Sequence, residues 1–467
     1  MKATLNKGKY VCYLLIVLSF ICYTQTYSQT LPVYKLTENS GDTINLQNQL
    51  LVIQKRYEKQ MDELPRENRK KIKEIYKDVF ENVKSMFDKG ELVNNTVAVN
   101  YLQKMTDKII SANPALQSIP INVYFSKSMV PNAYSVGFGV LIFNAGLFTK
   151  LDNESQVAYV LGHELSHIYF QHVDKGIEHY INTLYSDEVQ KKLREINKQV
   201  YKQGEALEKL GKGFVFNNKR HTRDHEQQAD SMSLVFLKPT NFDVKEALTA
   251  LGILDTIDNF KINTEGVLEK AFNNPGYPFK KSWLNKEEGL LGGHAVLKKE
   301  KELEDSMKTH PDCKARIKAL HGVVSSNINA SRLTNPVNQP LFKQIQKWAP
   351  YQIIDYYYKN KLYCPALYQS LELIEKENIN NKVVCSVGCI FNELYAAQKK
   401  HQLGNYIEMP APGYSKDYNT LLQFVNNLYL EDYAGIGFHF LSRYQQQYSS
   451  DKDFQSAYSN SQKNTKN

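Results

Sequence analysis

The chain has 467 residues, more than a single domain usually holds, so two or more folded units are expected. Its 42% hydrophobic and 23% charged residues are ordinary values for a globular protein. The formal charge of +9 is a mild surplus, and no Arg-rich cluster with interleaved aromatic residues accompanies it, so no nucleic-acid partner is expected.

The N-terminus has the pattern of an export signal. Lys2, Lys7 and Lys9 give it a positive start, and an apolar run from Val11 to Tyr23 follows. We expect residues 1–28 to be a signal peptide that is removed, although an uncleaved membrane anchor is the alternative. No later stretch is long and apolar enough to cross a bilayer, so we expect an exported protein, periplasmic or secreted, that is soluble once the leader is removed and has at most a peripheral membrane association.

Residues 29–69 are expected to form an N-terminal tail and a helix. A helical period runs from Leu46 to Lys89 and is broken at Pro65, and a further helix is expected near Val97 to Ala112. These segments precede the first strand-like pattern of the chain.

Two strands are expected after Pro120. Ile121 to Phe125 alternates apolar and polar residues, and a turn at Pro131 to Ser135 leads into a second strand from Gly137 to Asn144. The apolar run inside the second strand is typical of an ordinary buried strand. The alternative is an edge strand beside a metal ion, where an extended peptide could pair with it.

Residues 153–172 contain the sequence His163-Glu164-Leu165-Ser166-His167, an H-E-x-x-H pattern. Asn153 with Gln156 predicts a capped helix start, and apolar residues at helical spacing predict one buried face. On a helix, positions i and i+4 share a face, so both imidazoles can reach one ion while Glu164 lies beside it.

A second pair of acidic residues follows the same spacing. Glu226 and Asp230 lie at i and i+4 at the start of an apolar helix that continues to Leu237. Small Ala229 between them suggests burial, and buried carboxylates need a cation, which a zinc ion and its histidines would provide. The alternative is a solvated pair on the helix surface.

The remaining chain is expected to be helical. A charged segment from Ser186 to Lys212 predicts a solvated helix, residues 325–338 are rich in Asn and Ser and predict a linker, and residues 339–450 predict antiparallel helix pairs. Residues 451–467 are polar and are expected to be disordered. Because export favours disulfides, some of the thiols of Cys364, Cys385 and Cys389 are expected to pair.

Two histidines and one carboxylate leave one coordination position of zinc open for water, as in catalytic zinc sites. Zinc lowers the pKa of that water to about 7 and polarises a carbonyl, and Glu164 is placed to take the proton. Asp230 would orient one of the ligand imidazoles. The reaction these residues allow most directly is hydrolysis of a peptide bond, with one zinc ion per chain.

These motifs together resemble metallopeptidase family forty-eight, the HtpX-like and CAAX-prenyl-protease-like gluzincins. The resemblance rests on the H-E-x-x-H pattern, on Glu226-x-x-x-Asp230, and on Thr309-His310-Pro311 followed by Arg316, in that order. It covers roughly residues 70–320 and is similar to the exported branch with a C-terminal helical repeat region. It implies a mainly α fold with a small β-sheet, an α+β zincin-type catalytic domain over residues 70–324, followed by an all-α helical-hairpin domain.

The resemblance also implies roles for individual residues. The zinc ligands would be His163, His167 and Glu226, with Glu164 as the base and with Asp230, His310 and Arg316 as further catalytic residues. His310 would either hydrogen-bond the oxyanion or act as a removable fourth zinc ligand, and we favour the second role. The residues expected to bind substrate on the edge strand are Asn132, Ala133, Gly139, Val140, Leu141 and Ile142.

Two functions are compatible with this pattern. The first is an exported zinc endopeptidase that acts on misfolded or unassembled envelope proteins. The alternative is a chaperone-like protein whose C-terminal helices hold a client and whose proteolysis is minor or latent. The presence of Glu164 favours the peptidase, because a protein that only binds clients needs no general base.

Overall fold

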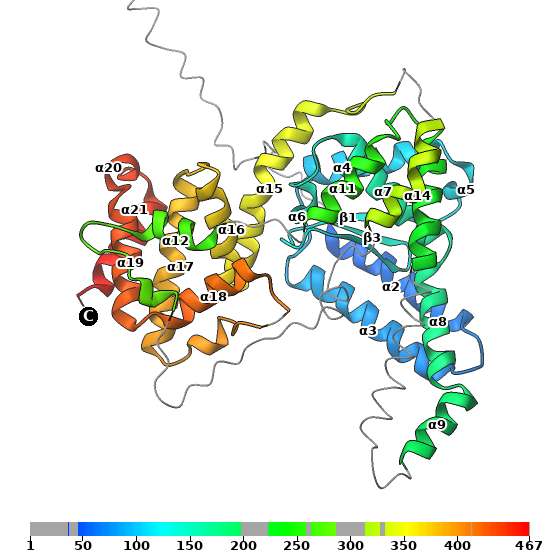
Figure 1. Cartoon of the computed structure of the whole chain (residues 1–467), viewed down its shortest axis with the longest axis horizontal. Coiled ribbons are helices and arrows are strands. Elements are labelled where there is room, and N and C mark those ends of the chain that lie inside the picture. The colour runs from blue at the N-terminus through cyan, green and yellow to red at the C-terminus, as the bar shows by residue number, and fades with distance from the viewer. Residues whose placement is uncertain are drawn as a thin grey trace, which may run out of the picture.

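The computed structural model describes residues 36, 45–197, 223–257, 263–285, 313–326, 332–411 and 413–466. These residues form two helical bodies, which Figure 1 shows side by side. The N-terminal body contains the small sheet, and α15 (Gln339–Lys359) runs from it into the C-terminal body: Phe342 packs in the first and Ile354 in the second. A mainly α fold with a small β-sheet, followed by a helical region, is thus confirmed.

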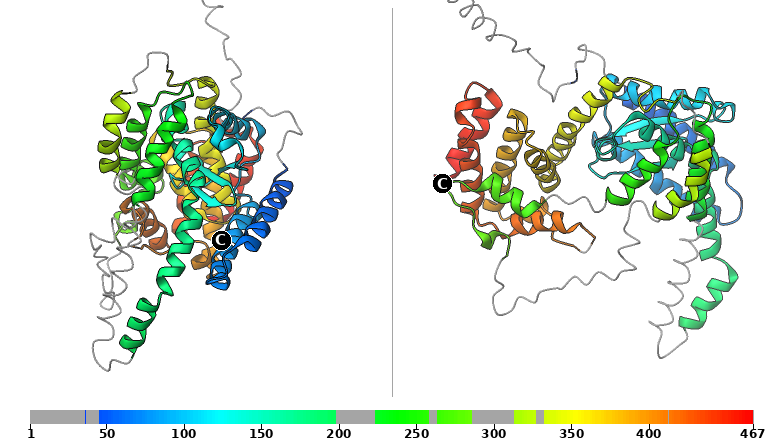
Figure 2. Two further views of the ribbon diagram at one scale, coloured as in Figure 1. Left: turned by 90° about the vertical axis from the view of Figure 1, so that its right-hand side faces the viewer. Right: turned by 45° about the horizontal axis from the view of Figure 1, so that its top comes forward.

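The N-terminal body is built from helices that surround one sheet. Its labelled helices are α2 (Leu46–Glu63), α3 (Arg69–Asp88), α4 (Thr96–Ser111), α5 (Pro114–Gln117), α6 (Ala145–Phe148), α7 (Glu154–Tyr169), α8 (His172–Leu184), α9 (Asp187–Asn197), α11 (Glu246–Ile257) and α14 (Cys313–Ser326). A further helix covers residues 223–237. The break expected at Pro65 lies between α2 and α3, because proline disfavours a helical conformation in the residue before it. Figure 2 shows α8 and α9 extending away from this body.

The sheet has three strands in the order β1-β3-β2. β1 (Asn122–Ser126) is parallel to β3 (Val140–Asn144), and β2 (Ala133–Gly137) is antiparallel to it. Leu141 and Phe143 of β3 pack in the core with α4 and α7, whereas Val140 and Ile142 pack on the opposite face among residues of α2 and α3. The continuous apolar run follows from this burial on both faces.

The expectation that the strand from Gly137 to Asn144 is an edge strand is wrong. β3 is the central strand, and its backbone pairs with β1 on one side and with β2 on the other. Val140, Leu141 and Ile142 therefore have no free side for a peptide. Gly139 serves the turn between β2 and β3: its φ is +69°, and a Cβ there would lie 1.9 Å from the Pro120 carbonyl oxygen.

The open edge of the sheet belongs to β2 instead. This strand pairs only with β3 among the described strands, and α7 packs against it. The segment from Pro131 to Ser135 was expected to be a turn, but residues 133–137 form the strand. The reason is that the reversal occurs at positions 137–139, where Gly137, Phe138 and Gly139 all have positive φ.

The C-terminal body contains only helices among its described residues. They are α12 (Thr264–Phe272), η1 (Lys281–Trp283), α16 (Tyr363–Glu375), α17 (Asn381–Lys399), η2 (Leu403–Asn405), α18 (Lys416–Asn427), α19 (Leu430–Ser442), α20 (Gln445–Tyr448) and α21 (Lys452–Asn464). α12 and η1 precede α14 in sequence, within the expected catalytic domain, yet Phe272 and Trp283 pack in this body, where both contact the ring of Phe424. A large apolar face decides this placement, since burial of such rings outweighs closeness in sequence.

Of the expected linker, residues 325–326 belong to the end of α14, and residues 332–338 are fixed to the start of α7. The carboxylate of Glu154, a residue with no exposed surface, accepts hydrogen bonds from the backbone N–H groups of Val337 and Asn338 and from the Tyr101 hydroxyl. Ser155 also donates to the carbonyl of Leu333. A buried carboxylate requires such donors, so this segment supports the helix that carries the H-E-x-x-H pattern.

The expectation that residues 451–467 are disordered is wrong for the described part of that segment. Residues 452–464 form α21, capped by Asp451, which accepts from the N–H of Phe454. Phe454 and Ala457 are buried in the C-terminal body, and α21 packs against α17 and α19. The polar composition of this segment was misleading, because a few apolar residues at helical spacing are enough to dock a terminal helix.

Replacing Phe454 with Ala tests this packing. Phe454 is 1% exposed, so the substitution should lower the free energy of unfolding by about 3–5 kcal/mol. Urea unfolding of the full chain, followed by circular dichroism, measures this change. Asn460→Ala on the exposed side of the same helix is the matched control and should have little effect; equal effects of the two substitutions would contradict the packing.

The four cysteines of the described residues are free, so the expected disulfide is not formed. Cys385 and Cys389 lie one turn apart on α17, and the Cys385 thiol donates to the side chain of Asn381. Burial raises the pKa of Cys385 to about 12, which keeps it a thiol.

None of the described helices has the length and apolar composition that a bilayer crossing requires. The expected signal peptide, residues 1–28, lies outside the described residues.

Candidate metal centre

The H-E-x-x-H pattern lies on α7, which is buried over most of its length. Asn153 caps the helix by accepting from the N–H of Gln156, as expected, while the Gln156 side chain accepts from Asp152 rather than from Asn153. Val157 and Leu161 anchor the buried face of α7 in the core. This anchoring fixes the axial position and rotation of the helix, and therefore the direction of His163 and His167.

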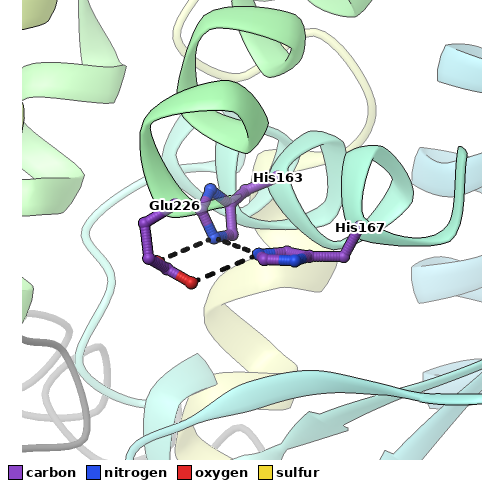
Figure 3. Close-up of side chains that lie close together, drawn as sticks. All are labelled: His163, His167 and Glu226. Atoms are coloured by element: carbon purple, nitrogen blue, oxygen red, sulfur yellow. Dashed lines mark hydrogen bonds and ion pairs between the residues drawn. The ribbon is translucent and has the colours of Figure 1, made fainter. Parts of the chain in front are cut away.

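The helix over residues 223–237 brings Glu226 to the two histidines (Figure 3). The Nε2 atoms of His163 and His167 are 3.1 Å apart, and each lies 3.4 Å from an oxygen of the Glu226 carboxylate. One ligand atom from each residue can be chosen so that all three lie within 4.8 Å of one another. The structure thus brings together the three residues that the sequence analysis selected.

These distances fit a tetrahedral zinc site. Nitrogen and oxygen ligands bind zinc at about 2.0–2.1 Å, so neighbouring ligand atoms around a tetrahedral ion lie about 3.3 Å apart. The separations between ligand atoms of His163, His167 and Glu226 are 3.1–3.4 Å. Two imidazole nitrogens and a carboxylate that converge at this spacing form a donor set for one small cation.

Asp230 lies one turn after Glu226 on the same helix and contacts His163 at Nδ1, the ring nitrogen that does not face Glu226. Its carboxylate is 2.9 Å from Nδ1 of His163 and accepts hydrogen bonds from the Tyr159 hydroxyl and from Arg316. Burial alone would raise the pKa of Asp230, but Arg316 and His163 outweigh it and hold the pKa well below its usual value. An ionised Asp230 keeps the His163 proton on Nδ1, which leaves Nε2 free to bind a metal.

Arg316, from α14, contacts both acidic residues, Glu226 and Asp230. Its Nε and Nη2 atoms lie 2.7 and 2.6 Å from the two oxygens of Asp230, and Nη1 lies 3.1 Å from Glu226. Although burial opposes its charge, these carboxylates raise the pKa of Arg316 above its usual value. Arg316 therefore neutralises and positions the two acids.

Glu164 is a residue of α7, and its carboxylate lies beside the edge strand β2. It is 7% exposed, and burial raises the pKa of its carboxyl, although His167 and His163 oppose that shift. The carboxylate also accepts a hydrogen bond from the backbone of Ser135, in β2. A buried carboxylate with a raised pKa is suited to accept a proton from water and to release it later.

Two further residues of this site, His172 and Tyr159, were not predicted from the sequence. Nδ1 of His172 lies 2.9 Å from Nδ1 of His167, and Nε2 lies 3.0 Å from the side-chain oxygen of Gln228. His172 is five residues after His167 and is not on the same helical face. It reaches back because Gln171 has a φ of +57° and separates α7 from α8, which a helical repeat does not predict. Tyr159 is four residues before His163, a spacing that could have revealed it.

The other predicted site residues lie in different places. Asn132 and Ala133 are at the start of β2, where the carbonyl of Asn132 accepts from the N–H of Asn144. Gly139, Val140, Leu141 and Ile142 belong to the turn and to the central strand. His310 lies outside the described residues, so its role stays a prediction.

Comparisons with known proteins agree with this geometry. Residues 98–324 match the model of peptidase family M48, a range that includes α7 and the Glu226 helix. The beta-barrel assembly-enhancing protease of Yersinia pestis is 27% identical over 96 residues, and the protein of the same name from Escherichia coli (strain K12) is 25% identical over 96 residues. Each alignment covers 21% of this chain and 20% of the relative, so the chain spans about a fifth of the length of the curated relatives it matches.

Proposed function

We propose that the chain, whose residues 98–324 match the model of peptidase family M48, is a zinc-dependent endopeptidase. The observation that carries this proposal is the convergence of His163, His167 and Glu226 at the spacing of tetrahedral zinc ligands. Each chain would hold one zinc ion. The ion would act as a Lewis acid and lower the pKa of a water from about 15.7 to about 7.

The zinc ligands are proposed to be Nε2 of His163, Nε2 of His167 and the carboxylate of Glu226. Two neutral histidines and one carboxylate leave one unit of positive charge on a bound Zn²⁺, which favours attraction of a substrate carbonyl oxygen. Asp230 and Arg316 act through the proposed ligands: Asp230 orients His163, and Arg316 holds Asp230 and Glu226 in place. Neither residue needs to contact the substrate for this role.

Glu164 is proposed to move the proton. Its carboxylate would take a proton from the attacking water and pass it to the nitrogen of the leaving amine, which completes peptide-bond cleavage. Burial supports the first step, because it raises the pKa of the carboxyl and so makes the carboxylate a stronger base. The hydrogen bond from the backbone of Ser135 keeps the Glu164 carboxylate turned toward the edge strand β2.

The substrate is proposed to be an extended polypeptide that pairs with β2. This strand offers an open edge beside Glu164, and added strands of this kind bind mainly through backbone hydrogen bonds. Backbone pairing would place a peptide bond next to the catalytic residues with little dependence on sequence. Such recognition suits substrates that are defined by being unfolded.

The proposed setting is protein quality control in the cell envelope. Residues 1–28 have the pattern of a signal peptide, and the relatives from Yersinia pestis and Escherichia coli that match part of the chain are beta-barrel assembly-enhancing proteases by name. We therefore propose that this protein is exported and that its substrates include misfolded or unassembled envelope proteins.

Removal and return of metal test the proposed chemistry. The purified protein should contain one zinc ion per chain and hydrolyse casein. Dialysis against a chelator should remove both properties, and stoichiometric zinc should restore hydrolysis. Unchanged hydrolysis by protein from which all metal has been removed would reject the zinc mechanism, as would a zinc-loaded protein that cleaves no polypeptide.

A further inference from the structure

We propose that His172, held by Gln228, is a positioning residue that fixes the tautomer and the ring orientation of His167. The inference rests on the proposed function, since it assumes that His167 binds zinc through Nε2. On this proposal Nδ1 of His167 contacts a neutral imidazole, whereas Nδ1 of His163 contacts the carboxylate of Asp230.

The chain places His172 behind His167 through the break between two helices. α7 ends at Tyr169, and the positive φ of Gln171 starts α8 at His172 in a new direction. As a result, the two Nδ1 atoms lie 2.9 Å apart, while Nε2 of His167 points toward Glu226. His172 is itself 5% exposed, so solvent does not compete strongly for this contact.

The hydrogen-bond chain has one consistent arrangement of protons. The side-chain oxygen of Gln228 can only accept, so the proton of a neutral His172 lies on Nε2, 3.0 Å away. Nδ1 of His172 then has a free lone pair and accepts from Nδ1–H of His167. His167 is thereby left with its lone pair on Nε2, the atom that faces His163 and Glu226.

Neighbouring rings hold the His172 imidazole in its plane. The ring of His225 stacks on it with centroids 3.9 Å apart and an interplanar angle of 7°, and the ring of Phe170 stacks at 5.4 Å and 20°. Because His225 and Gln228 both lie on the helix that carries Glu226, this helix supplies a zinc ligand and also the contacts that orient the outer histidine.

The two ligand histidines therefore have unlike partners. Nδ1 of His163 faces the Asp230 carboxylate, whereas Nδ1 of His167 faces a neutral imidazole. A carboxylate makes the imidazole that it accepts from more electron-rich than a neutral acceptor does. His172 consequently orients His167 without adding a further negative charge to a site that already holds Glu164, Glu226 and Asp230.

Zinc affinity, measured by competition with a coloured chelator, tests the proposal independently of hydrolysis. His172→Phe keeps a ring that can stack but removes the acceptor, so zinc affinity should fall about 10–100-fold. His172→Asn keeps an acceptor oxygen near the position of Nδ1 and should bind zinc within a few-fold of the unsubstituted protein. Gln228→Leu should give a loss between those of the two His172 variants.

A second measurement reports the tautomer directly. In zinc-loaded protein with ¹⁵N-labelled histidine, His167 should be protonated at Nδ1, and this signal should become heterogeneous in His172→Phe. Urea unfolding of the metal-free variants should match that of the unsubstituted protein, which separates positioning from a general loss of structure.

The outcomes separate this inference from the proposed function. If the unsubstituted protein binds no zinc, the proposed function fails. If it binds zinc and His172→Phe binds it equally well, only the inference is overturned. Equal losses in His172→Phe and His172→Asn would overturn it too, since the acceptor would then not be the cause, and unchanged affinity in Gln228→Leu would remove Gln228 from the chain.

Discussion

Replacing Glu164 with Gln should abolish nearly all hydrolysis and leave zinc bound. The amide has almost the same shape as the carboxylate but cannot take a proton from water, and loss of a general base typically costs about 10²–10⁴-fold in rate. Zinc content should stay at one ion per chain, because Glu164 lies beside the three proposed ligands and is not one of them. Hydrolysis rates and metal content, both measured on the same preparation, check this expectation.

The control for this substitution is the same change, Glu to Gln, at an exposed residue away from the site. Glu188→Gln, on exposed α9, makes the same change of charge far from the site and should leave both rate and zinc content unchanged. A Glu164→Gln variant that kept more than a tenth of the activity would show that another group serves as the base.

Replacing Glu226 with Ala should remove both zinc and activity. The substitution leaves His163 and His167 as the remaining proposed ligands, and it also leaves Arg316 without the carboxylate that lies 3.1 Å from its Nη1. Arg316 would keep Asp230 as its partner, but the negative charge that faces the metal would be lost while the guanidinium charge stays nearby. Zinc affinity should therefore fall by more than the roughly 10–100-fold that loss of an outer contact costs.

A neighbouring residue supplies the matched control for Glu226. Gln227 lies on the same helix with an exposed side chain, so Gln227→Ala should keep zinc and hydrolysis. Titration with zinc, followed by a casein assay at saturating metal, measures both properties. Full zinc binding and activity in Glu226→Ala would mean that the third ligand is a different residue.

Much of the candidate site could be predicted from local spacing. His163 and His167 are brought to one face by the helical repeat itself, and the capping residue Asn153 marks where that helix begins. Glu226 and Asp230 follow the same logic on a second helix. No tertiary information was needed to recognise that these residues share faces; their meeting depended on the fold.

The edge strand could not be identified in this way. A run such as Val140 to Phe143 is compatible with a central strand or with an edge strand whose faces are both covered, and nothing local distinguishes the two. Strand order depends on which segments pair across the sheet. β2 occupies the edge because the turn at Gly137 to Gly139 folds it back antiparallel against β3, on the side that β1 leaves free.

The sequence by itself determined the mainly helical composition, the break at Pro65, and the two helices that carry the proposed ligands and base. Those features depend on interactions within a few residues, whose geometry is fixed by the backbone. Only the tertiary structure decided that β2 is the open edge, that α12 and α21 dock in the C-terminal body, and that His172 stands behind His167. Each of these depends on burial or pairing between segments far apart in the chain, and a local pattern does not specify which partner a face or an edge will find.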